Sequence, residues 1–299
     1  MNKSFTLIEI LVVIVVIGIL SAFILVGMSS ISNSANIAKN QAFVNSLDNS
    51  LLLGRVSQWR LDEGSGTTAN DSWLINNGTL ATSPGFDNTT AGWGDTHTSG
   101  WMSQSNCISG TCLKFDGTDD GVYKTSFSGL PSSAITVTAW IKGTLTTSWM
   151  TVVGHDWGNS TGTWLLFLKN SEIDFGVYQL PATQYKGIKT FSVANNIWYH
   201  ITGTYDGSIV KVYVNGSIGE TTASTSVSLA NTGNIYIGYA PALFNGLIDD
   251  ARVYNQALST SEIQQNYFLG LNSLYKNGGI TQLEYSDRLS DLKTNLTQQ

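Results

Sequence analysis

The chain has 299 residues and a formal net charge of −6; 42% of its residues are hydrophobic, 12% are charged, 30 are glycine and nine are tryptophan. This composition excludes a disordered chain and is typical of a loop-rich β protein with enough apolar side chains to fill a core. Nucleic acid is not expected as a partner, because binding phosphates requires clustered Lys and Arg, which the sequence lacks.

The first expected element is an apolar helix that begins at Phe5. A leader of residues 1–4 with one cation, Lys3, precedes it, and no charged residue occurs between Ile10 and Ala38. Residues 5–28 would form a helix about 36 Å long, which exceeds the roughly 30 Å hydrocarbon core of a membrane. We therefore expect residues 5–28 to span the bilayer.

Glu9 lies one turn inside this apolar stretch. A carboxylate at the centre of a membrane helix costs about 2.5 to 3.5 kcal/mol and needs a partner. No Lys or Arg is close enough in the sequence, but removal of the leader would create an α-amine at Phe5. The corresponding amine of a neighbouring subunit would neutralise Glu9, so the pattern predicts assembly between copies.

The sequence Ser4-Phe-Thr-Leu-Ile-Glu9, followed by an apolar helix, resembles the class III signal of bacterial type IV pilins and pseudopilins. The resemblance implies that a prepilin peptidase cuts between Ser4 and Phe5 and methylates the new amine, and that Glu9 aligns subunits in a filament. Ser4 replaces the usual Gly, and Val26 replaces the Pro of many major pilins. The alternative is an ordinary signal anchor or a secretory signal cut near Ala22; the long apolar run and the weakly basic leader disfavour it.

Helical spacing continues from residue 29 to Gly54, which is expected to end the helix. From Val56 the period of the hydrophobic residues changes to two, and turn residues are frequent. Asp206-Gly207 and Asn215-Gly216 predict hairpins. The predicted strands are 113–115, 135–141, 151–153, 164–168, 173–177, 198–204, 209–214, 234–237 and 247–253. We expect a mainly β protein, an antiparallel β-sandwich behind a long N-terminal α-helix.

Several phrases resemble the LamG-like jelly roll, also called the concanavalin A-like lectin/glucanase fold. They are Trp59–Gly66 with Asp71, Cys112–Gly117, Thr136–Ile141, Trp198–Gly207, Val212–Gly216 and Gly246–Tyr254. The resemblance implies a jelly roll over residues 55–268, but it says little about the ligand, because one fold serves many functions. The segment 87–105 has no counterpart and is interpreted as an inserted loop.

Cys107 and Cys112 are the only cysteines and enclose a Gly-containing loop. Two cysteines do not supply the four ligands of a zinc site. Because the chain is also expected to be exported, we predict a disulfide that holds this loop.

Glu63 and Asp71 lie near the first strand, and Asp249 and Asp250 lie on the last. These strands are neighbours in a jelly roll, so their carboxylates are candidate calcium ligands. The resemblance to LamG-like domains implies such a structural calcium. The alternative is that a carboxylate only caps a turn.

Catalysis is not expected. Glu172-Ile-Asp174-Phe-Gly176 resembles the Glu-x-Asp-x-Glu strand of some glucanases of this fold, but Gly176 replaces the third carboxylate that a retaining mechanism needs. None of the three histidines, His97, His155 and His200, lies in the G-x-S-x-G sequence context of a catalytic serine.

Carbohydrate binding would require aromatic side chains on loops. Trp93, Trp101 and Trp157 lie in polar, turn-rich segments and are the candidates for ligand contact. Core packing is the alternative for each of them.

Ser259–Glu262 forms a capping box that predicts a helix to about Phe268, and Thr281–Glu284 forms a second box. Residues 269–299 are therefore expected to form a short helical segment. It is similar to a short C-terminal oligomerisation motif of bacterial proteins; a terminal hairpin docked on the sandwich is the alternative.

Together these features predict a type IV pilin-like filament subunit of the bacterial cytoplasmic membrane. After processing, it would display the jelly roll on a cell-surface filament and bind a glycan or surface protein. The alternatives are a pseudopilin of a type II secretion or DNA-uptake machine with a purely structural sandwich and, less favoured, a membrane-anchored glycan hydrolase. The partners expected are other pilin subunits, prepilin peptidase and the membrane.

Overall fold

The computed structural model describes residues 52–82, 100–144, 149–156, 162–170, 172–178, 186–223, 226–239 and 242–297. The chain divides into two compact units, Met1–Ser50 and Leu51–Gln299, and only the second is described below. The expected membrane helix 5–28, with Ser4, Phe5 and Glu9, lies outside the described residues. Within those residues, no helix is long and apolar enough to cross a membrane.

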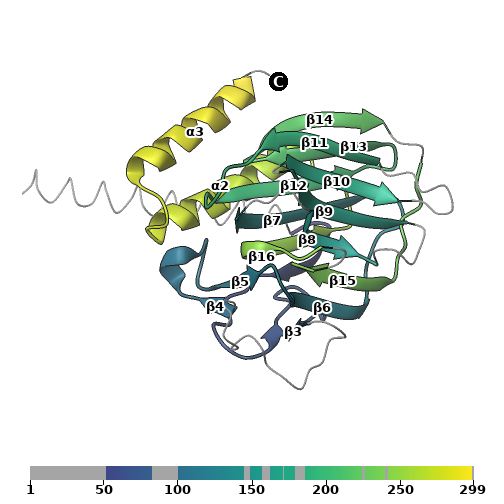
Figure 1. Ribbon diagram of the computed structural model, residues 1–299. Helices are drawn as coiled ribbons and strands as arrows, with labels where there is room; N and C mark the ends of the chain where they lie inside the picture. The colour runs from purple at the N-terminus through teal and green to yellow at the C-terminus, as the bar shows by residue number, and fades with distance from the viewer. Residues whose placement is uncertain are drawn as a thin grey trace, which may run out of the picture. The chain divides into compact units, whose positions relative to one another are not determined.

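The described unit consists of two antiparallel sheets that pack face to face (Figure 1). Sheet A contains, in spatial order, β14 (Ser217–Ala223), β13 (Ile209–Val214), β12 (Tyr199–Tyr205), β7 (Ile135–Gly143), β16 (Asn245–Tyr254), β5 (Cys112–Asp116) and β4 (Gly100–Met102), with β1 (Arg55–Trp59) also paired to β16. Sheet B contains β11 (Lys186–Ser192), β10 (Glu172–Tyr178), β9 (Thr163–Lys169), β8 (Met150–His155), β15 (Gly233–Ile237), β6 (Asp120–Phe127), β3 (Gly78–Thr82) and β2 (Thr68–Ala69). The expected β-sandwich is confirmed.

The last strand, β16, organises sheet A. One edge of β16 pairs with β7 along most of its length. Its other edge pairs first with β5 and then with β1, where Trp59 lies opposite Ala251. The beginning and the end of the domain therefore lie side by side, as the jelly-roll resemblance implied.

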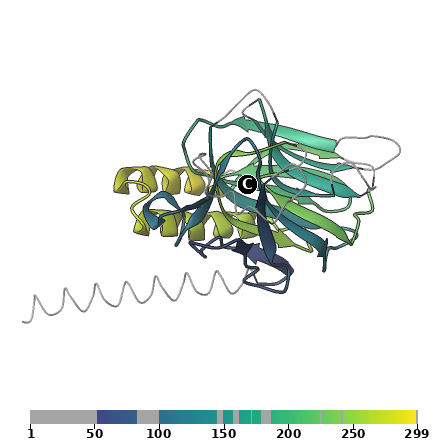
Figure 2. The same ribbon diagram turned by 60° about the horizontal axis from the view of Figure 1, so that its bottom comes forward.

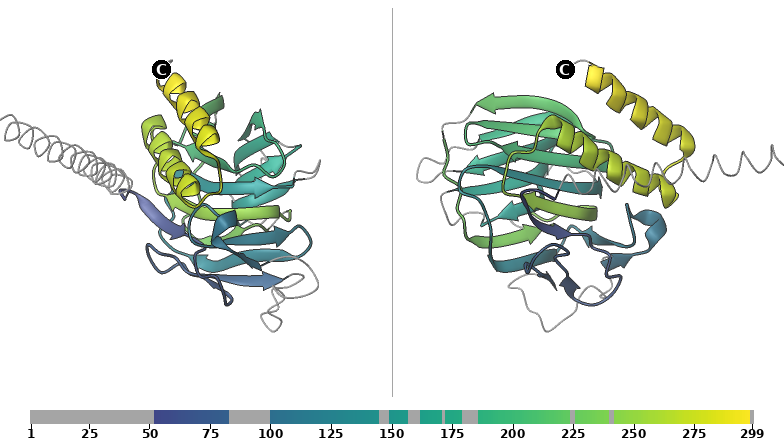
Figure 3. Two further views of the ribbon diagram at one scale, coloured as in Figure 1. Left: turned by 90° about the vertical axis from the view of Figure 1, so that its left-hand side faces the viewer. Right: turned by 180° about the vertical axis from the view of Figure 1, so that it is seen from behind.

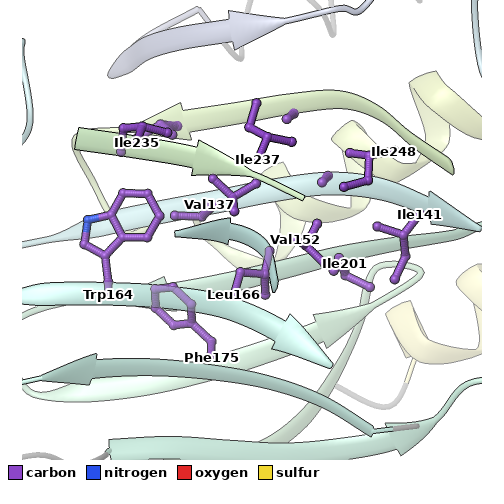
Figure 4. Close-up of a cluster of buried hydrophobic side chains, with 14 of the residues drawn as sticks. Val137, Ile141, Val152, Trp164, Leu166, Phe175, Ile201, Ile235, Ile237 and Ile248 are labelled. Carbon is purple, nitrogen blue, oxygen red and sulfur yellow. The ribbon is translucent and has the colours of Figure 1, made fainter. Parts of the chain in front are cut away.

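The core lies between the sheets and is built from the alternate residues of each strand. Figure 4 shows the side chains of sheet B meeting those of sheet A: Trp164, Leu166, Phe175, Ile235 and Ile237 face Val137, Ile141, Ile201 and Ile248. Gly203 on β12 permits the closest approach, because a Cβ there would lie 2.2 Å from the Phe175 ring. A missing side chain thus sets the local distance between the sheets.

The outer face of sheet A is also covered at β7. Thr136, Thr138 and Trp140 alternate with the core residues, yet each is at most 1% exposed. Helices α2 (Thr260–Lys276) and α3 (Gln282–Thr297) lie side by side against this part of the sandwich (Figures 2 and 3). Alternation of residue types within a strand could not reveal that the C-terminal helices shield the second face.

Most predicted strands are present with shifts of one or two residues. Both predicted hairpins are confirmed, and Asn215 and Gly216 both have positive φ, as a type I′ turn requires. Edge strands β11 and β14 were missed, because they carry many polar residues. The interpretation of 87–105 as a loop is wrong at its end, where Gly100–Met102 forms β4.

The capping box at Ser259 is confirmed, with Glu262 donating and accepting as expected for that motif. The predicted helix end near Phe268 is wrong, because α2 continues to Lys276. The boundary expected between the jelly roll (55–268) and the C-terminal helical segment (269–299) therefore lies inside one helix. The additional turns carry Leu271 and Leu274, which are fully buried, so packing on sheet A extends the helix.

Candidate functional site

Asp71 follows β2 and holds a loop against β1. Its Oδ2 accepts hydrogen bonds from the Ser57 hydroxyl (2.8 Å) and the Asn76 backbone N–H (3.1 Å). Its Oδ1 accepts from the backbone N–H groups of Gln58 and Trp73, both at 3.0 Å. Both oxygens are therefore satisfied by the protein itself, and this residue joins the loop 72–76 to the first strand.

Asp249 is fully buried on the outer face of β16. Its Oδ2 accepts a hydrogen bond from the Ile108 backbone N–H at 2.7 Å, and a longer one from Ser109. Burial, reinforced by the neighbouring Asp250 carboxylate, raises the pKa of Asp249 well above its ordinary value. This shift disfavours the charged form of the carboxyl group, which holds the loop containing Ile108.

That loop is closed by the predicted disulfide, which is confirmed: Cys107 and Cys112 are joined with an S–S distance of 2.05 Å. The Ile108 carbonyl accepts a hydrogen bond from Asn277, the residue that caps α2 at its C-terminal end (2.9 Å). The loop thus connects the last strand to the C-terminal helix.

Glu63 accepts a hydrogen bond from the Asn70 backbone N–H at 2.9 Å. It does not share a ligand set with Asp71 and Asp249. In the described part of the chain, two groups of acidic or sulfur atoms lie within 4.8 Å of one another: Cys107, Cys112 and Asp249; and Asp116, Asp119 and Asp120. The first group contains a disulfide, whose sulfurs are not thiolate ligands. Only the second group, at the β5–β6 turn, has the oxygen donors that calcium prefers.

Trp101 on β4 is half-buried and packs against the main core. Its Nε1 donates a hydrogen bond to the Gly66 carbonyl at 2.9 Å. These contacts fit the packing alternative for Trp101. Trp93 and Trp157 lie outside the described residues.

His200 is buried against the rings of Trp140 and Tyr267, at centroid distances of 5.3 and 6.1 Å. Burial, together with the charge of Arg252, lowers the pKa of His200 to about 3. His155 is buried against Trp164. These two histidines are packing residues in the structure, and His97 lies outside the described residues.

The glucanase-like strand segment forms β10, where Glu172, Asp174 and Gly176 share the outer face of sheet B. Gly176 lies opposite Leu165 of β9 and Gly187 of β11. Neither of the residues opposite Gly176 therefore supplies the carboxylate that a glucanase strand carries at its third position.

A row of tyrosines on the outer face of sheet B was not identified from the sequence. Tyr123 on β6 lies directly opposite Tyr236 on β15, and both alternate with core residues, so they face away from the core. Their rings stack at 6.2 Å, and Tyr239 continues the row at 6.1 Å from Tyr236. All three are half-buried. Only the pairing of β6 with β15 brings Tyr123 to Tyr236 and Tyr239, since Tyr123 is more than 100 positions from both in the chain.

A second feature is a polar pocket of about 370 Å³ at the end of β5, β7 and β16. Leu247 lies between Lys114 and Lys142, because these two residues pair with it from opposite sides. Asn245 and Asp116 also line the pocket. Its mixture of both charges and amide groups fits a small polar ligand without selecting one class.

Two family models match the sequence. Residues 116–264 match the concanavalin A-like lectin/glucanases superfamily, and residues 1–25 match the prokaryotic N-terminal methylation motif. The chain carries a concanavalin A-like domain behind a type IV pilin signal. No curated protein matches the sequence.

Solved structures share the fold of the concanavalin A-like domain. One is Domain 4 of AbnA, a GH43 extracellular arabinanase from Geobacillus stearothermophilus, in complex with arabinotriose: the TM-score is 0.54 at 19% identity, covering 70% of this chain and 96% of that one. Another is the receptor binding domain of botulinum neurotoxin D, with a TM-score of 0.56 at 16% identity, covering 74% and 54%. A third is the serotype D ligand binding domain in complex with N-acetylneuraminic acid, with a TM-score of 0.55 at 16% identity, covering 74% and 52%.

The present chain therefore spans about half the length of the neurotoxin chains. At these identities, the likeness concerns the fold of the concanavalin A-like domain and not its ligand.

Proposed function

We propose that this chain is a type IV pilin-like subunit that is inserted in the bacterial cytoplasmic membrane, cut after Ser4 by a prepilin peptidase and polymerised with other pilin subunits. The observation that carries the proposal is the methylation motif over residues 1–25, with the lectin-like domain in the same chain. Glu9 would be neutralised by the methylated amine of Phe5 in the neighbouring subunit.

Mass spectrometry of the mature chain tests the processing step, with methylated Phe5 expected as the first residue. Replacing Glu9 by Ala should leave cleavage intact and reduce incorporation into filaments at least tenfold, measured by immunoblotting of sheared surface fractions. A mature chain that begins at Met1 or near Ala22, or normal filaments from Glu9→Ala, contradicts the proposal.

The displayed domain would bind a glycan, free or on a surface protein, through the tyrosine row. The exposed parts of these half-buried rings would offer apolar surface to sugar rings, and their hydroxyl groups would offer hydrogen bonds. The arabinanase domain and one of the neurotoxin domains have been crystallised with sugars, which supports a sugar ligand for this domain as well.

Glycan-array binding by purified full-length protein tests this part. Tyr236→Ala removes the central ring and should abolish detectable binding, whereas Tyr275→Ala, on helix α2, should have little effect. Equal binding by both variants excludes the tyrosine row. No binding by the parent protein, together with normal filaments, favours the pseudopilin alternative. The presence of Val26 in place of Pro also favours that alternative. Turnover that Glu172→Gln abolishes would favour the hydrolase.

A structural calcium remains a proposal. The group that fits best is Asp116, Asp119 and Asp120, rather than the predicted Glu63, Asp71 and Asp249. A melting temperature that rises with added calcium and falls with chelator supports calcium binding. If calcium still raises the melting temperature of Asp119→Asn, the calcium site lies at other residues.

A further inference from the structure

The polar pocket at the end of β5, β7 and β16 lies on the outer face of sheet A. Leu247 of β16 lies directly between Lys114 of β5 and Lys142 of β7, which pair with it from opposite sides. Ile141 and Ile248, which follow or precede these residues in the chain, belong to the main core. Because side chains alternate along a strand, the two lysines and Leu247 point together to the outer face.

The cationic and the acidic parts of the pocket are separated along the strands. Asp116 and Asn245 pair with each other two residues away from Lys114 and Leu247, so they lie on the same face. Two residues of a strand span about 7 Å. The pocket therefore has two ammonium groups on either side of Leu247, and a carboxylate and an amide about 7 Å further along the sheet.

The floor of the pocket is apolar. Leu247 is 9% exposed and belongs, with the half-buried Met102, to the second apolar cluster. The polar side chains of Thr144, Asn196 and Asn245 also line the pocket. A ligand that fits this lining has an apolar face and several hydrogen-bonding groups at its edge.

Backbone hydrogen bonds hold the polar rim together. The Thr144 N–H donates to the Asn245 carbonyl at 2.9 Å, and the Asn196 N–H donates to the Gly143 carbonyl at 3.0 Å. The ends of β7 and β16 and the loop before β12 are therefore joined to one another. Binding is favoured by such an arrangement, because the backbone of the rim does not have to be ordered when the ligand arrives.

We infer that this pocket binds a sugar acid, a pyranose ring that carries one carboxylate group. The carboxylate lies between Lys114 and Lys142, whose flexible stems bring their ammonium groups to it for charge-assisted hydrogen bonds. The ring lies on Leu247, and its hydroxyl groups reach Asp116 and Asn245. The volume of about 370 Å³ is near the lower limit of ligand pockets, about 300 Å³, and suits a single sugar unit.

The charges of the lining favour this ligand over other small molecules. Lys114, Lys142 and Asp116 are the charged residues that line the pocket, so the lining has one net positive charge. One carboxylate balances that charge, whereas a phosphate dianion exceeds it and is repelled by Asp116. A neutral sugar leaves the two lysines without an anion, and a simple anion leaves the apolar floor without a contact.

An NMR titration of the purified full-length protein with sodium galacturonate tests the inference. Galacturonate should bind at least tenfold more tightly than galactose, which has the same ring without the carboxylate. Lys142→Gln removes one cation and should weaken galacturonate binding at least tenfold. Lys211→Gln is the matched control, because Lys211 of β13 alternates with core residues on the same sheet but does not line the pocket.

The other outcomes also decide. Equal binding of galactose, or no binding of galacturonate, overturns the inference. Phosphate or acetate that binds as tightly as galacturonate shows a simple anion site and overturns it as well.

The tyrosine row lies on sheet B, so the inference does not depend on it or on filament assembly. Galacturonate binding that Tyr236→Ala removes and Lys142→Gln leaves intact overturns the inference and supports the proposed glycan site. Loss in Lys142→Gln alone, with no glycan binding that depends on Tyr236, keeps the inference and removes the proposed role of the tyrosine row.

Lysine acetylation provides a second measurement, on the unaltered protein. Saturating galacturonate should slow the acetylation of Lys114 and Lys142 by acetic anhydride several-fold and leave the rate at Lys211 unchanged, measured by mass spectrometry of peptides. This result does not depend on the folding of a variant. Equal rates with and without galacturonate at all three lysines overturn the inference.

Discussion

The contact between Trp140, on the outer face of sheet A, and helix α2 shows how single residues determine the packing of this domain. Gly270 of α2 lies directly on Trp140 of β7, and a Cβ at position 270 would lie 2.3 Å from the indole Nε1. The same indole stacks on Tyr267, one turn earlier in α2, at 5.6 Å. The helix can therefore approach the sheet only because residue 270 has no side chain.

Replacing Gly270 by Ala should move α2 away from Trp140. Alanine favours helix, but overpacking of a rigid ring costs about 1 to 3 kcal/mol, so we expect a net loss of stability. Thermal unfolding of residues 51–299 measures it, and Ser261→Ala, at an exposed position of the same helix, is the control. A higher melting temperature for Gly270→Ala would contradict the close contact.

Asp249 predicts a pH dependence. Its folded pKa is raised above the unfolded value near 3.8, so its contribution to stability is complete below that pH and is lost as the pH rises toward the folded pKa. Asp249→Asn keeps an acceptor for Ile108 without a charge. Its stability relative to the parent should therefore increase from pH 5 to pH 8, measured by urea unfolding.

Asp287→Asn, at an exposed position of α3, is the control for this series and should follow the parent at every pH. His200 acts in the opposite direction, because its lowered pKa reduces stability as the pH falls from about 6.5 toward 3. Because the parent and Asp249→Asn both contain His200, this effect largely cancels in the difference between their stabilities, and the comparison can be made from pH 5 to pH 8.

At the scale of elements, the C-terminal helices form part of the domain core. The second apolar cluster combines Trp140 and Trp198 of the sheet region with Tyr267, Leu271 and Leu274 of α2 and Leu292 of α3. Helix α2 contributes most of the helical contacts, and α3 remains more exposed, with Leu283 at 71%. The docked hairpin fits these contacts, while an oligomerisation role for α3 stays a prediction.

Truncation separates the two helices. A chain that ends at Leu258 exposes Trp140 and Trp198 and should aggregate or lose several kcal/mol of stability, because about 25 cal/mol is lost for each Å² of apolar surface exposed. A chain that ends at Gly279 retains α2 and its cap and should lose much less. Equal solubility and melting temperature for both chains would show that α2 is dispensable.

At the scale of the whole molecule, the chain joins a signal for processing and assembly to a domain with a lectin-like fold. The tyrosine row lies on sheet B, whereas the C-terminal helices cover the outer face of sheet A. The tyrosine row and the face covered by the C-terminal helices thus lie on different sheets of the domain.

Local patterns were sufficient for much of this description. Four features depend only on residues that are close together in the sequence. They are the order Ser4, Phe5 and Glu9, the change of hydrophobic period near Val56, the two Gly-containing hairpins and the short loop between Cys107 and Cys112. They predicted the signal, the sandwich, its turns and the disulfide, because secretion signals, strand alternation and turn conformation depend on nearby positions.

Only the tertiary structure decided which distant residues meet. Strand pairing placed Tyr123 beside Tyr236, and α2 buried the second face of β7. Asp71 and Asp249 were predicted as calcium ligands, but they lie in different hydrogen-bond networks. A carboxylate looks the same in the sequence whether it binds a cation or backbone N–H groups, and only the donors that the fold brings to it distinguish the two.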